Sequence, residues 1–136
     1  MKTTFDTDSI LFRLLNGSPL KTEINGGIYC GDDRPENSEL EDVCINSIDL
    51  TQDYLPQLGT SNVNIYVSDT TKKIAGKQQL KANSTRLKEL AEMAIATLKQ
   101  ANVPDLNVIV TSQTTLAEST IKQHYVNIRI EWFICS

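Results

Sequence analysis

The chain has 136 residues, of which 40% are hydrophobic and 22% are charged, so its length and composition are those of one ordinary globular domain. Its net charge of −4 argues against duplex DNA as the main ligand, because phosphate binding needs a concentrated basic face. We expect no membrane span and no signal peptide. Three cysteines without a CxxC pair indicate buried thiols rather than a disulfide framework.

The first predicted element is a short amphipathic helix from about Asp8 to Asn16. Its Ile and Leu side chains recur at helical spacing, so one face is expected to pack on the core. Asp6 or Asp8 can cap the start of this helix, and Gly17 can end it. Pro19 follows closely and is expected to prevent any helical continuation.

Three strands are predicted next. A short strand around Ile28 and Tyr29 follows Gly26-Gly27, a pair that permits a tight or positive-φ turn. The second strand spans residues 43–50, and its apolar phase changes half-way, which indicates a bulge or burial of both faces. The third strand spans residues 62–67 and alternates cleanly between apolar and polar side chains.

The polar stretch from Ser68 to Asn83 is long for a structureless loop in a compact domain. It is predicted either to stay mobile until a partner binds or to extend the neighbouring strands as a hairpin. This stretch is rich in lysine, whereas the segment Asp32–Asp42 is rich in acids. Charge is therefore divided along the chain: residues 1–70 carry 4 − 12 = −8, and residues 71–136 carry 9 − 5 = +4.

The last part of the chain predicts a long helix and two strands. The helix spans about Ser84 to Ala101, with Asn83 or Ser84 as its cap and one broad apolar face. A strand over residues 106–111 leads into a connection rich in Ser, Thr and Gln. The final strand, residues 126–134, alternates most regularly and is the strongest β signal in the chain.

Together these elements predict an α+β fold in the order α-β-β-β-α-β-β. If the long helix lies across one face of a mixed or antiparallel sheet, the apolar face of the helix and the apolar face of the sheet bury each other. We expect a single domain over residues 1–136. The polar faces of the third and last strands indicate that the other side of the sheet is solvated or covered by a neighbour.

Residues typical of catalysis or metal binding are sparse. His124 is the only histidine, and its position just before the last strand is typical of a surface or strand-end residue. No phosphate-binding glycine motif and no zinc spacing occurs. The acidic segment lacks the ligand order and central glycine of an EF-hand loop, although a small metal-dependent enzyme built on it is one alternative. We predict no catalytic residue, no metal site and no cofactor.

Several local sequences follow one another in a recognisable order. Gly27-Ile28-Tyr29 comes after the first helix, VCINSI forms the second strand, and NVNIYV precedes the polar stretch, the long helix and the final hydrophobic strand. This pattern resembles the tail completion or tail terminator proteins of long-tailed phages and prophages, also called head-to-tail or neck joining proteins. The acidic segment and the lengthened Lys-rich stretch depart from the usual pattern of that family.

The resemblance implies a structural α+β subunit that forms a ring, commonly a hexamer, on the finished tail tube. Such a subunit is assembled in the bacterial cytoplasm and becomes part of the virion, in its tail or neck. The implied partners are other copies of the chain, the tail-tube protein and the head-connector protein. The resemblance implies no catalysis and no cofactor, and we expect no membrane association and no direct nucleic-acid specificity.

The opposite charges of the two halves predict a contact between neighbouring copies, because a closed ring requires one patch to meet a different patch on the next subunit. The residues predicted at this subunit interface are Asp32, Asp33, Glu36, Glu39, Glu41, Asp42, Lys72, Lys73, Lys77 and Lys81. Solvated loops, or pairing of the charges within one molecule, are alternative interpretations. The alternative function is a small soluble, monomeric protein-binding or regulatory module that is not part of a virion.

Overall fold

The computed structural model describes residues 1–136. The α-helices are α1 (Thr4–Asn16), α2 (Pro19–Glu23) and α3 (Ser84–Lys99). The strands are β1 (Ile28–Cys30), β2 (Val43–Leu50), β3 (Gln57–Ser68), β4 (Thr70–Ile74), β5 (Lys77–Lys81), β6 (Leu106–Glu118) and β7 (Gln123–Ile134), and a 3-10 turn, η1 (Ser119–Ile121), joins the last two.

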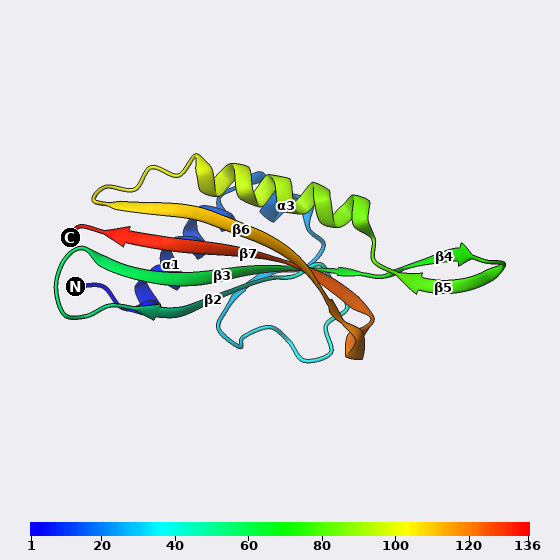
Figure 1. Ribbon diagram of the computed structural model, residues 1–136. Coiled ribbons are helices and arrows are strands. Elements are labelled where there is room, and N and C mark those ends of the chain that lie inside the picture. Colours follow the sequence, from blue (N-terminus) through cyan, green and yellow to red (C-terminus); the bar gives the residue numbers. More distant parts are fainter.

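Five strands form one mixed sheet in the order β1-β2-β3-β7-β6, in which only β1 and β2 are parallel. The helices lie together on one face of this sheet, while β4 and β5 form a separate two-stranded ribbon that projects from the body (Figure 1). The predicted α+β class with a mixed sheet is confirmed. The predicted element order is incomplete, because it omits α2 and does not count β4 and β5, whose hairpin was one of the two alternatives for residues 68–83.

Two helices cover the sheet, whereas only the long helix was expected to lie across it. The helix α1 packs on β1 and β2, and α3 packs on β3, β6 and β7. The start of α1 lies earlier than predicted because the Asp6 carboxylate accepts a hydrogen bond from the backbone N–H of Thr3 (2.7 Å), as in a capping box. Pro19 does not end the helical region, since it begins α2, where its missing N–H costs no helical hydrogen bond.

The core lies between the helices and the sheet. All five apolar side chains predicted on one face of the last strand are buried: Val126, Ile128, Ile130, Trp132 and Ile134. The strand β2 has a register shift between Ser47 and Asp49, as its change of apolar phase predicted. Ile45 and Leu50 are consequently both buried, whereas Ile48 between them is 52% exposed.

A chain of hydroxyl groups crosses this core and ties α1 to the sheet. The Trp132 indole N–H donates to Ser61 Oγ (2.8 Å), Ser61 Oγ lies 2.7 Å from Ser47 Oγ, and Ser47 Oγ lies 2.6 Å from Thr7 Oγ1. Each polar atom therefore has a partner, which is the condition for burying it without a large desolvation cost.

The strand β6 is longer than predicted. Residues 112–118, expected to be a connection, continue β6 because β7 starts at Gln123 and pairs with β6 along its whole length. A register shift between Val110 and Ser112 marks a bulge within this strand. The extension was not recognised because its polar, Thr-rich sequence has no apolar alternation, and tertiary pairing decides its conformation. It forms the outer edge of the sheet, with residues 111–117 exposed.

Candidate interaction surfaces

Asp42 belongs to the acidic segment in sequence, but it is an internal structural residue. Its side chain is fully buried and accepts hydrogen bonds from the Gly27 backbone N–H (2.9 Å) and from Arg34 Nε (2.8 Å). Arg34 also donates to Gln123 Oε1 (2.8 Å) and lies 3.9 Å from the ring centroid of Tyr66. Because a buried charge requires a partner, Asp42 fixes this segment to the open face of the sheet, and we remove it from the predicted subunit interface.

Glu41 is also engaged within the molecule. Its two carboxylate oxygens accept hydrogen bonds from Nε and Nη2 of Arg86 on α3 (2.7 and 2.8 Å), and Arg86 Nη1 donates to Glu23 (2.8 Å) and Glu89 (3.0 Å). The hydrogen bonds from Arg86 hold the pKa of Glu41 below its ordinary value, and the same contacts raise the pKa of Arg86. Glu41 therefore joins the acidic segment to α2 and α3, and it is not free to pair with another subunit.

The other four acids of this segment are available to a partner. Asp32, Asp33, Glu36 and Glu39 are exposed, and none of them forms an ion pair within the chain. We call these four residues the acidic patch. Glu39 lies at the end of the sheet near β4, since the hydroxyl of Ser68 donates to its carbonyl oxygen (2.9 Å), whereas Asp32 lies beside β2 and β3 and Asp33 beside α1 and β1.

The glycine pair before β1 allows the acidic segment to pass close to the backbone at this point. A Cβ atom on Gly26 would lie 2.5 Å from the Glu41 carbonyl oxygen, so only glycine fits where the acidic segment passes. Neither Gly26 nor Gly27 has a positive φ, which corrects the positive-φ alternative predicted for this turn.

The ribbon of β4 and β5, Thr70–Lys81, is named the arm. Its two strands are joined by Ala75 and Gly76, whose φ angles of 53° and 80° are those of the type I′ turns that match the twist of a hairpin. The stretch predicted as a mobile loop or a hairpin is therefore a hairpin here. All four lysines, Lys72, Lys73, Lys77 and Lys81, are exposed and form no ion pair within the chain.

Two contacts fix the base of the arm. His124 Nδ1 lies 2.6 Å from Asp69 Oδ1, and the Asp69 backbone N–H donates to the Lys122 carbonyl oxygen (3.0 Å). His124 is half-buried at the start of β7, which agrees with the strand-end alternative predicted for it. The sequence could not show this pair, because Asp69 and His124 meet only through the pairing of β3 with β7.

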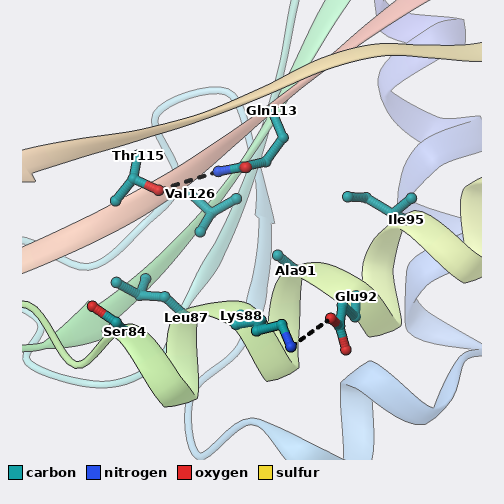
Figure 2. Close-up of a pocket in the computed structure, with 9 residues that line it drawn as sticks. All are labelled: Ser84, Leu87, Lys88, Ala91, Glu92, Ile95, Gln113, Thr115 and Val126. Carbon is teal, nitrogen blue, oxygen red and sulfur yellow. Dashed lines mark hydrogen bonds and ion pairs between the residues drawn. The ribbon is translucent and has the colours of Figure 1, made fainter.

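A groove of about 280 Å³ lies between the first half of α3 and the edge strand β6 (Figure 2). Its lining residues are Ser84, Leu87, Lys88, Ala91, Glu92, Ile95, Gln113, Thr115 and Val126. Lys88 and Glu92 pair with each other at its rim (3.4 Å). Sequence reasoning missed this groove because residues 112–117 were expected to be a connection rather than a strand beside the helix.

Within the chain, no group of three or more His, Cys, Asp or Glu side chains is arranged to hold a metal ion, and no helix has the length and apolar character needed to cross a bilayer. No protein-family model matches this chain, and no curated protein matches it in sequence. The surfaces of the molecule thus include the acidic patch, the arm and the groove beside β6, together with larger hollows between α1 and β1 and over β2 and β3.

Proposed function

We propose that this chain is a ring-forming structural subunit that terminates the tail tube of a long-tailed phage or prophage and joins it to the head connector, without catalysing a reaction. Two things support the proposal. The first is the resemblance in element order and local sequence described above. The second is the arm, which is the observation that carries it.

The arm is built to contact something outside its own molecule. A two-stranded hairpin without further packing is only marginally stable in water, and the arm strands chiefly contact each other. The arm carries four positive charges and no negative one, whereas the rest of the chain carries 9 bases against 17 acids, which is −8. A second copy of the same chain therefore offers the arm an oppositely charged surface.

Two unpaired patches of opposite sign on one molecule favour self-assembly. When the arm of one copy meets the acidic patch of another, copies can join head to tail, and such contacts close into a ring when the rotation between neighbours allows it. The same contact could also be made reciprocally in a dimer. The family resemblance favours the ring, so the number of copies in the assembly tests the proposal.

Sedimentation velocity over a range of protein concentrations makes this test. The wild-type chain should form a closed assembly of more than two copies, and this assembly should weaken as ionic strength rises. Changing Lys72, Lys73, Lys77 and Lys81 to Glu should abolish it, while changing the same four residues to Arg should preserve it because the charge is retained.

Two results would overturn the proposal. A wild-type chain that remains monomeric up to millimolar concentration would favour the monomeric binding module instead. An unchanged sedimentation profile for the four-Glu variant would remove the arm from assembly. The role in a tail has an independent check, since genes for portal, tail-tube and tape-measure proteins should neighbour the gene for this chain.

A further inference from the structure

We infer that the groove between α3 and β6 receives the arm of another copy, with strand β5 added to the free edge of β6 and Leu80 placed against α3. This inference names the contact by which copies join, and it rests on the self-assembly in the proposed function. Three features carry it: an unprotected sheet edge, an apolar wall beside that edge, and one arm strand whose side chains fit both.

The edge of β6 lacks most of the protection that natural edge strands have. Over residues 106–117 it contains no charged residue, no proline and no glycine. Edge strands of monomeric proteins are usually short, charged, interrupted by proline or covered, because open N–H and C=O groups pair with any available strand. The opposite edge strand, β1, is protected by its length of only three residues. In β6, a bulge near Thr111 is the one feature that hinders pairing with another strand. An additional strand on β6 is therefore expected.

The helix α3 supplies a wall for that additional strand. A strand placed beside β6 directs alternate side chains toward the helix-covered face, where Gln113 and Thr115 of β6 already point. Leu87, Ala91 and Ile95 of α3 line the same groove. Strand addition with a pocket for alternate side chains is an established way of binding extended segments.

The arm strand β5 fits this position better than β4. Alternation places Leu80 and Gln78 on one face of β5, so this face has an apolar side chain and no charge. In β4, Lys72 shares a face with Ile74, and Lys73 occupies the other face, so either face would bring a lysine into the groove. Leu80 is 49% exposed in the single chain and therefore has apolar surface left to bury.

The charges of the arm agree with this orientation. When Leu80 faces α3, Lys77 and Lys81 point to the opposite side of the extended sheet, as does Lys72. That is the face on which Arg34 packs over Tyr66 and holds the acidic segment. Three of the four lysines thus lie on the same side of the assembled sheet as Asp32, which lies near Tyr66, whereas Lys73 pairs with Gln78 and shares the face of Leu80.

Disulfide trapping between two differently substituted chains tests the inference. In a Cys135→Ser background, a chain with Leu80→Cys is mixed with a chain carrying Gln113→Cys or Thr115→Cys under mild oxidation. We expect a covalent heterodimer with at least one of these two groove positions. The matched control is Thr114→Cys, which lies on the same strand but points to the opposite face, and its yield should be at least tenfold lower.

The outcomes separate this inference from the proposed function. If the chains assemble in sedimentation but neither groove position cross-links, the arm docks elsewhere and only the inference fails. Equal yields at Thr114 and Thr115 would also overturn it, because the contact would have no defined face. If the chains neither assemble nor cross-link, the inference and the proposed function both fail.

Discussion

The acidic segment and the arm look alike in the sequence, since each is a polar run dominated by one sign of charge, yet the structure uses them differently. In the acidic segment, Asp42 and Glu41 are bound by Arg34 and Arg86 inside the molecule. In the arm, no lysine has a partner. The comparison teaches that a charge run becomes part of the fold only where a basic or acidic side chain from elsewhere in the chain reaches it.

This difference separates stability from assembly. Substitutions at Asp42 and Arg86 should lower the free energy of unfolding, because these residues hold the acidic segment, α2 and α3 together. Substitutions in the arm should leave the free energy of unfolding unchanged and weaken the contact between copies. Three predictions test that division.

The largest effect is expected at Asp42. The Asp42→Ala substitution removes the acceptor of Arg34 Nε and of the Gly27 N–H, and breaking such a buried pair costs about 3–5 kcal/mol. Urea denaturation followed by circular dichroism measures the loss. Asp32→Ala, which removes an exposed carboxylate from the same segment, is the control and should change the free energy of unfolding by less than about 0.5 kcal/mol. Equal effects of the two substitutions would contradict the internal role of Asp42.

A smaller and pH-dependent effect is expected at Arg86. Hydrogen bonds to charged groups contribute about 1.5–3 kcal/mol, so Arg86→Gln should lower the free energy of unfolding at pH 7 by an amount in that range. Lys88→Gln on the same helix removes only a surface pair at 3.4 Å, and its effect should stay below about 0.5 kcal/mol.

The pH dependence of the Arg86 effect follows from Glu41. Its folded-state pKa is lower than the ordinary value of 4.5, so its contribution to stability is fully present above pH 4.5. This contribution is lost as the pH falls through the folded-state pKa. Wild type and Arg86→Gln should therefore converge in stability below pH 4.5. A gap that stays constant from pH 7 to pH 3 would show that Glu41 is not the partner that matters.

The smallest free-energy change is expected at Leu80, and it should appear in assembly alone. Leu80→Ser should weaken the association of copies by about tenfold, because burying the exposed half of a leucine side chain contributes on the order of 1 kcal/mol. The control is Ile74→Ser, an exposed aliphatic residue on the other face of the arm, for which we expect a weaker effect. Analytical ultracentrifugation compares the two variants, and a larger loss for Ile74→Ser would reverse the orientation that we infer for the arm.

The elements that could be predicted from the sequence are those with a clear apolar period. The face of α3 and the alternation in β7 are visible in the sequence because burial requires them, and the bulge in β2 follows from its change of phase. The second half of β6 could not be predicted, because its conformation depends on pairing with β7 rather than on its own residues. The groove beside β6 was missed for the same reason.

The candidate interface could be predicted only in part. The sequence identified ten charged residues by their density and sign, but it could not show which of them are paired internally. Arg86 lies 45 residues after Glu41, and the fold alone brings them together. Eight of the ten residues, namely the acidic patch and the four arm lysines, have no ion pair within the chain.

A charge exchange between two variants tests the central claim, that the arm of one copy meets the acidic patch of another. One variant carries Glu at Lys72, Lys73, Lys77 and Lys81, and the other carries Lys at Asp32, Asp33, Glu36 and Glu39. Each variant alone should fail to assemble, because arm and patch then have the same sign. Mixing the two at equal concentration restores opposite signs at every contact and should restore the wild-type sedimentation profile. A mixture that remains dissociated, or either variant assembling alone like the wild type, would contradict the account.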